Sequence, residues 1–106
     1  MKNLKTITLP TPEEIARRMA ENFGSSDHDK RLWAEIARHG GRALNGGGIV
    51  NVLNLAISDY IEKGGYPAFL GSALLLMRAD YIAALIDDAE VRQGALDFMD
   101  EVEARK

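Results

Sequence analysis

Apolar residues recur at helical spacing over most of the chain, and the polar residues around them mark where helices begin and end. Near the N-terminus, Ile15, Met19 and Phe23 are four residues apart and form one apolar stripe. The segment before them, Thr-Pro-Glu-Glu at residues 11–14, has the form of a capping box with proline at the first helical position. A first helix is therefore expected from residue 12 to about residue 23, ended by Gly24.

Four further helices follow from the same reasoning. Ser26, with Asp29 three residues later, starts a second helix that continues through the apolar residues 32, 33, 36 and 37 to the glycine pair at residues 40–41. An almost continuous apolar run over residues 49–61 predicts a buried third helix. Pro67 starts a fourth helix that reaches about residue 86, with the core candidates Leu74, Leu75, Met77, Tyr81, Ile82 and Leu85. An acidic first turn at residues 87–90 starts a fifth, whose apolar face comprises Val91, Ala95, Phe98 and Val102.

Only residues 5–9 alternate polar and apolar side chains as a strand does. Because one strand cannot form a sheet, this segment either lies on the bundle as an extended arm or pairs with a second chain. We therefore expect an extended N-terminal arm over residues 1–10 and a single helical domain over residues 11–106. The predicted fold class is all-α, a compact bundle of about five helices with short loops.

Composition and charge narrow the possible functions. The chain has no cysteine, which excludes thiol catalysis, thiolate zinc sites and disulfides. Residues 1–50 carry eight basic and six acidic side chains, whereas residues 51–106 carry five and ten, so the net charge of -3 hides a basic half and an acidic half. The longest apolar stretch, residues 66–77, is shorter than the roughly 20 residues of a membrane span, and no secretion signal is visible. We expect a cytoplasmic protein, in a bacterial host cell, that makes no membrane contact.

The sequence contains no catalytic or metal-binding motif. There is no Gly-x-Ser-x-Gly, and no serine has a histidine neighbour at a recognised spacing. His28 and His39 both fall on the expected second helix, but eleven helical residues separate them by about 16 Å, too far to share a metal ion. We therefore predict no enzymatic activity, no metal and no cofactor.

Basic residues cluster around the only tryptophan. Basic side chains can follow a sugar-phosphate backbone while an aromatic face stacks on a base, an arrangement typical of proteins that bind single strands. The glycine run before the third helix could add backbone N–H groups that hold a phosphate. The alternatives are a tryptophan that belongs to the core and a glycine run that is only a flexible helix junction. The candidate nucleic-acid-binding residues are Lys30, Arg31, Trp33, Arg38, His39, Arg42, Gly46, Gly47 and Gly48.

The acidic C-terminal helix offers a different kind of surface. Carboxylates around an amphipathic helix usually form a solvated face, but they can also imitate nucleic-acid phosphates or dock a basic partner. The candidate partner-binding residues are Asp97, Asp100, Glu101 and Glu103.

Two segments support a resemblance to a known group: residues 4–23, and residues 46–60 with the sequence Gly-Gly-Gly-Ile-Val-Asn-Val-Leu-Asn-Leu-Ala-Ile-Ser-Asp-Tyr. With these segments, the chain resembles the small anti-CRISPR proteins of phages and mobile elements, of the type I-E group. The resemblance lies in general character: a short, acidic, cysteine-free and helical chain. It implies stoichiometric inhibition, in which the protein occupies the crRNA-guided surveillance complex, blocks its recruited helicase-nuclease, or engages the single-stranded DNA that the complex exposes. The alternative is a small single-stranded-DNA-binding or regulatory protein of phage or plasmid origin. A monomer and a homodimer are both compatible with the sequence.

Overall fold

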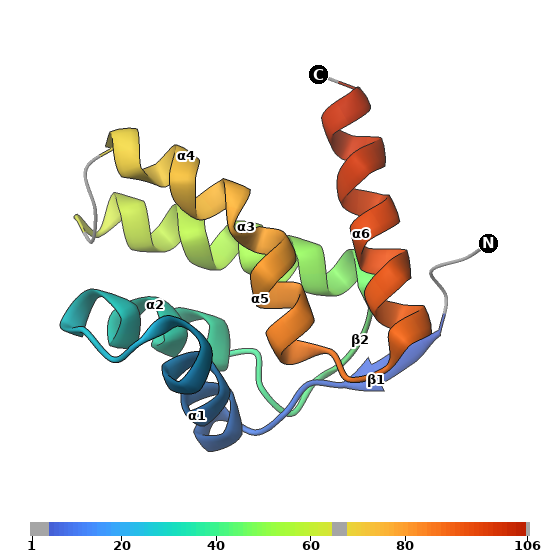
Figure 1. Ribbon diagram of the computed structural model, residues 1–106, viewed down its shortest axis with the longest axis horizontal. Coiled ribbons are helices and arrows are strands. Elements are labelled where there is room, and N and C mark those ends of the chain that lie inside the picture. Colours follow the sequence, from blue (N-terminus) through green and yellow to red (C-terminus); the bar gives the residue numbers. More distant parts are fainter. Residues whose placement is uncertain (1–4, 65–67, 106) are drawn as a thin grey trace.

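Helices make up most of the polypeptide, which confirms the all-α prediction (Figure 1). The computed structural model describes residues 5–64 and 68–105, without the side chains of residues 68 and 69. In this part of the chain the elements are β1 (Thr6–Thr8), α1 (Pro12–Phe23), α2 (Asp27–Ala37), β2 (Ala43–Asn45), α3 (Gly46–Glu62), α4 (Ala68–Leu76), α5 (Arg78–Leu85) and α6 (Ala89–Ala104).

Side-chain caps start three helices where the sequence predicts them. The Thr11 hydroxyl accepts a hydrogen bond from the Glu14 backbone N–H at 3.3 Å, and the Ser26 hydroxyl accepts one from the Asp29 N–H at 3.1 Å. The Asp88 carboxylate caps α6 through the Val91 N–H at 3.1 Å. These caps bond to N–H groups that lack partners within the helix.

The third helix, α3, is buried, as predicted, and lies at the centre of the fold. It packs against α2, α4 and α6, while α1 covers the far side of α2 (Figure 1). Only the first part of α6 lies against α3, and its C-terminal half extends away from the body (Figure 1). The largest fully buried side chains are Leu9, Ile15, Met19, Leu32, Ile36, Ile49, Leu53, Ile57, Tyr60, Ile82, Leu85 and Ile86.

The glycine run is not a flexible junction. Gly46, Gly47 and Gly48 form the first turn of α3, which Asn45 caps by accepting a hydrogen bond from the Gly48 N–H at 2.8 Å. A Cβ atom at Gly46 would lie 2.7 Å from the Ala95 backbone nitrogen, so this glycine lets α3 and α6 approach closely. The requirement for glycine therefore comes from helix packing.

The N-terminal strand finds its partner within the same chain, which neither predicted alternative included. β1 pairs antiparallel with β2, and Ile7 lies opposite Leu44. Both of these side chains pack against the hydrophobic core. Lys5 adds an ion pair with Asp88, at 2.7 Å, that ties the strand to the start of α6 and lowers the pKa of the Asp88 carboxyl.

The predicted fourth helix is divided in two at Met77. The Arg78 side chain donates from Nε to the Leu75 carbonyl at 2.8 Å, so it caps the end of α4. Leu75 was expected in the core, but it is 39% exposed, and Leu55 of α3 is 58% exposed. The predicted start at Pro67 lies outside the described residues.

Candidate nucleic-acid interface

Four basic residues lie on or just after α2, with their side chains exposed. Lys30 and Arg31 belong to the helix, Arg38 is its C-terminal cap residue, and Arg42 precedes β2. The opposite face of α2 is buried through Leu32, Trp33 and Ile36. Burial of this face leaves Lys30 and Arg31 on the solvent-exposed side of the helix.

Arg31 is held in place by two groups that do not cancel its charge. Its guanidinium carbon lies 5.8 Å from the centroid of the Tyr60 ring, a cation–π contact. Its Nη2 is 3.0 Å from His28 Nδ1, which is itself 3.1 Å from the Tyr60 hydroxyl. Because a guanidinium only donates hydrogen bonds, Arg31 is the donor in its contact with His28.

Arg42 is positioned by the loop that leaves α2. Its Nη1 lies 3.0 Å from Nδ1 of His39, a half-buried residue. The loop turns at Gly41, which has a φ of +80°, in the left-handed region that favours glycine. The Gly41 N–H donates to the carbonyls of Leu9 and Pro10, and the Leu9 N–H donates to the Arg42 carbonyl at 2.9 Å. The backbone at Arg42 is therefore anchored to the segment after β1.

Arg38 differs from the other three basic residues because carboxylates surround it. It forms ion pairs with Glu35 and with Asp59, the latter at 3.2 Å. Glu35 also pairs with Lys63. Within the described part of the chain, no carboxylate forms an ion pair with Lys30, Arg31 or Arg42. We call these three residues the α2 cationic face.

Two other candidates, Trp33 and the glycine run, are covered by other parts of the fold. Trp33 is only 4% exposed and belongs to the core, so its ring face cannot stack on a base. Gly46 is buried against Ala95, and a Cβ at Gly47 would touch the Phe98 ring at 3.5 Å. α6 therefore covers the start of α3, where the sequence placed the phosphate site, and Asn45 already accepts from the Gly48 N–H.

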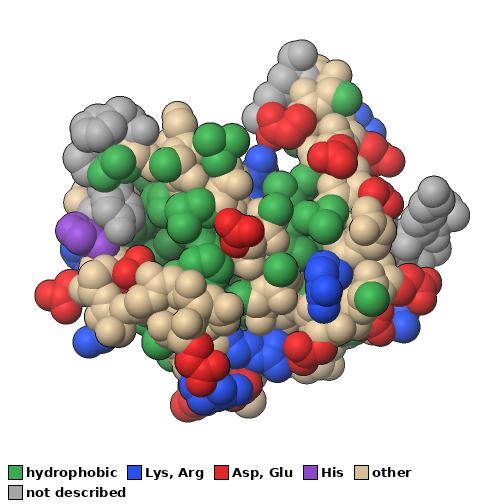
Figure 2. All heavy atoms as spheres, viewed as in Figure 1, with side chains coloured by type: hydrophobic (Ala, Val, Ile, Leu, Met, Phe, Trp, Pro, Cys, Tyr) green, Lys and Arg blue, Asp and Glu red, His purple; other side chains and the backbone are tan. Residues whose placement is uncertain are grey.

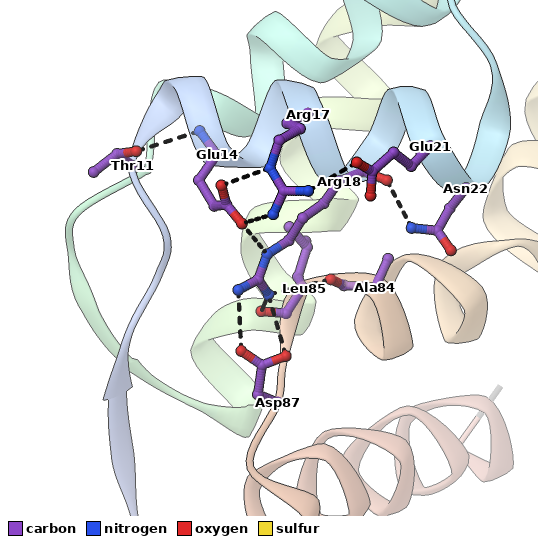
Figure 3. Close-up of polar contacts among 9 residues, drawn as sticks. All are labelled: Thr11, Glu14, Arg17, Arg18, Glu21, Asn22, Ala84, Leu85 and Asp87. Carbon is purple, nitrogen blue, oxygen red and sulfur yellow. Dashed lines mark hydrogen bonds and ion pairs between the residues drawn. The ribbon is translucent and has the colours of Figure 1, made fainter.

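Two arginines of α1, outside the predicted basic cluster, are exposed or partly exposed but paired with carboxylates (Figure 3). Arg17 pairs with Glu14 and with Glu21, the latter at 2.8 Å. Arg18 pairs with Glu14 at 3.1 Å and with Asp87 at 3.0 Å. Hydrogen bonds from Arg17 and Arg18 lower the pKa of the Glu14 carboxyl to about 2. The spacing of these residues along α1, three or four positions, was a signal present in the sequence.

The four acidic candidates of α6 have different surroundings. Asp97 accepts a hydrogen bond from Gln93 at 3.0 Å, and Asp100 and Glu101 are exposed. Glu103 pairs at 2.9 Å with Arg78, a buried arginine that sequence reasoning missed. Only part of the predicted acidic surface is therefore open to a partner.

Neither a metal site among the described residues nor a related protein indicates what the chain binds. No group of three or more His, Asp or Glu side chains among the described residues could hold a metal ion. Within the same residues, no helix is long and apolar enough to cross a membrane. Comparison with known protein families, curated proteins and solved structures finds no match to the chain.

Proposed function

We propose that the protein is a non-enzymatic inhibitor of CRISPR interference that binds the single-stranded DNA exposed by a crRNA-guided surveillance complex. The resemblance to small anti-CRISPR proteins supplies the biological setting. The α2 cationic face supplies the physical support, because Lys30, Arg31 and Arg42 are exposed and form no ion pair with any described carboxylate. This absence of internal neutralisation is the observation that carries the proposal.

Unpaired cations favour a polyanion for an energetic reason. A lysine or arginine that replaces the counterions of a phosphate releases them, and this release drives nucleic-acid binding. An arginine already paired with a carboxylate must first give up that partner. The eleven residues of α2 extend over about 16 Å, which is long enough to face several successive phosphates of one strand.

We expect a single strand to bind more tightly than a duplex. Duplex DNA is stiff over about 50 nm and presents its phosphates at fixed positions. A single strand can bend to bring its phosphates to Lys30, Arg31 and Arg42. Base stacking is not part of this proposal, since Trp33 is buried.

A fluorescence anisotropy titration with labelled oligothymidine, between about 50 and 200 mM salt, tests DNA binding. Replacing Lys30, Arg31 and Arg42 together with alanine should remove a slope of about 2 from the plot of log K against log salt, at about 0.7 for each phosphate. The matched control replaces Lys5, Arg17 and Arg105, which are also exposed, and makes the same change in net charge. Equal losses in the two variants would show a non-specific charge effect and contradict the proposed site.

A second experiment tests inhibition. Phage plating on a host with an active type I-E system should be restored by the wild-type protein and by the control variant, but not by the Lys30, Arg31 and Arg42 variant. DNA binding without any restoration would replace this proposal by the alternative of a general single-stranded-DNA-binding or regulatory protein.

A further inference from the structure

A groove runs between α4 and the outer half of α6, on different helices from the α2 cationic face. It has a volume of about 640 Å³, and Leu75, Leu76, Met99 and Val102 form its apolar lining. Figure 2 shows hydrophobic side chains in the hollow beside α6 and acidic side chains along the outer part of that helix. Asn54, Ser72, Arg78 and Glu103 complete the lining, so the groove has an apolar wall beside polar groups.

The groove exists because α6 is longer than the surface it packs on. Its first half buries Val91 and Ala95 against the core. The same apolar stripe continues through Met99 and Val102, which are only half-buried. Facing them, Leu76 is 83% exposed. Scattered exposed leucines are ordinary, but apolar side chains gathered in a concave surface mark interaction sites.

Arg78 keeps the two walls of the groove in place. It is 8% exposed, and each of its three guanidinium nitrogens donates a hydrogen bond: to the Leu75 carbonyl, to Asn54 Oδ1 at 2.7 Å and to Glu103 Oε1 at 2.9 Å. These bonds connect α3, α4 and α6, so the groove is formed before any partner binds. Because Arg78 is already engaged, it does not favour a small anionic ligand.

The charge around the groove decides between the remaining occupants. α4 carries no charged side chain, whereas the outer half of α6 carries four carboxylates, Asp97, Asp100, Glu101 and Glu103. Of these, Glu103 lines the groove and pairs with Arg78. A second copy would bring an equally acidic α6 to the same groove, and like charges would oppose that contact. A partner with basic side chains would instead be attracted.

We propose that this groove binds an amphipathic helix of a partner protein, with apolar side chains facing Leu76 and Met99 and with lysines or arginines on its polar face. Apolar residues of a helix at i, i+3 or i+4, and i+7 fit grooves between two helices in this way. The carboxylates of Glu103, which lines the groove and is half-exposed, and of Asp100, next to Met99 on α6, would lie nearest the basic face of that helix. The inference goes beyond DNA binding, since it assigns a protein-docking surface to another side of the fold.

Selection from a displayed library of amphipathic helices, with either basic or acidic polar faces, tests this inference on the full chain. We expect the enriched helices to be basic. Their affinity should fall by at least about tenfold in Leu76→Lys, because the change removes an apolar contact and repels the helix. Lysine is favourable at the C-terminal end of α4, so this variant should fold. Leu55→Lys makes the same change at an exposed leucine that does not line the groove, and should bind like the wild type.

Each other result would overturn the inference. Enrichment of acidic helices, failure to enrich any helix, or equal binding to Leu76→Lys and the wild type would show that the groove is not a site for basic helices. Sedimentation velocity tests whether a second copy of the chain occupies the groove. Dimers that form in the wild type but dissociate in Leu76→Lys would identify a second copy as the occupant.

Discussion

The arginines of α1 and the cations of α2 lie on neighbouring helices and reach solvent, but they differ in what surrounds them. Arg17 and Arg18 contact Glu14, and each has one further carboxylate. Lys30 and Arg31 form no ion pair with the described carboxylates. The difference arises from which cations the carboxylates of each helix contact in the fold.

On α1, the acidic residues Glu14 and Glu21 stand three or four positions from Arg17 and can fold over it. On α2, Asp27 and Glu35 stand four positions from Arg31, yet Glu35 pairs with Arg38 and Lys63. The acidic residues Asp27 and Asp29 lie in the first turn. The Ser26 hydroxyl caps the Asp29 N–H and donates to the Asp29 carboxylate at 2.6 Å. Two helices of similar charge therefore present different surfaces, and only unpaired cations indicate a site for an anion.

The largest expected effect comes from a substitution on the buried face of α2, compared with one on its exposed face. Trp33→Ala removes a buried ring, and should lower the free energy of unfolding by about 3–5 kcal/mol, out of a total of about 5–15. Urea unfolding followed by circular dichroism measures this loss, and Arg31→Ala provides an exposed control on the same helix. Unchanged stability together with weaker DNA binding would mean that Trp33 stacks on a base after all.

Single substitutions compare the two helices directly. Lys30→Ala, Arg31→Ala and Arg42→Ala should each reduce the salt slope of single-strand binding by about 0.7, whereas Arg17→Ala should leave the slope unchanged. All four variants lose one positive charge, so net charge cannot explain a difference. A slope that falls equally in Arg17→Ala would end the distinction between α1 and α2.

Arg38 allows the reverse experiment, a gain of binding. Replacing Glu35 with Gln and Asp59 with Asn removes the carboxylates that pair with Arg38 and also releases Lys63 from Glu35. The double variant should therefore raise the salt slope by up to about 1.4, at about 0.7 for each released cation. The control is Glu14→Gln with Glu21→Gln, which makes the same change in net charge on α1. An equal increase of the salt slope in the control would show that the position of Arg38 on α2 does not matter for binding.

The smallest expected effect is the acid sensitivity of the α1 ion pairs. The pKa of Glu14 is about 2 in the folded chain, below its ordinary value of 4.5, because Arg17 and Arg18 stabilise the carboxylate. Since the folded pKa is the lower one, the stabilisation is fully present above pH 4.5 and is lost as the pH falls toward 2.

Urea midpoints measured from pH 7 to pH 2 test this dependence. The wild type should lose more stability than Glu14→Gln below pH 4.5. Glu13→Gln makes the same charge change outside the Arg17 and Arg18 contacts. Parallel curves for the wild type and Glu14→Gln would show that these ion pairs do not contribute to folding.

The candidate site was only partly readable from the sequence. Clustering is a local property, so the sequence brought Lys30, Arg31 and Arg42 together as candidates, and the structure leaves all three exposed. Their binding to a nucleic acid stays a prediction. The contact of Arg38 with Asp59, 21 residues away, could not be read from the chain. The burial of Trp33 was left open because an aromatic residue next to basic ones fits both a core and a stacking surface.

The sequence by itself determined the helix starts at Thr11, Ser26 and Asp88, since caps and apolar spacing act within a few residues. Tertiary structure alone decided the pairing of β1 with β2, because β2 has only three residues and no alternation of its own. It also decided that Gly46 lies against Ala95 and that Arg18 reaches Asp87. These contacts join residues far apart in the chain, and their formation depends on how the helices pack, which no local pattern encodes.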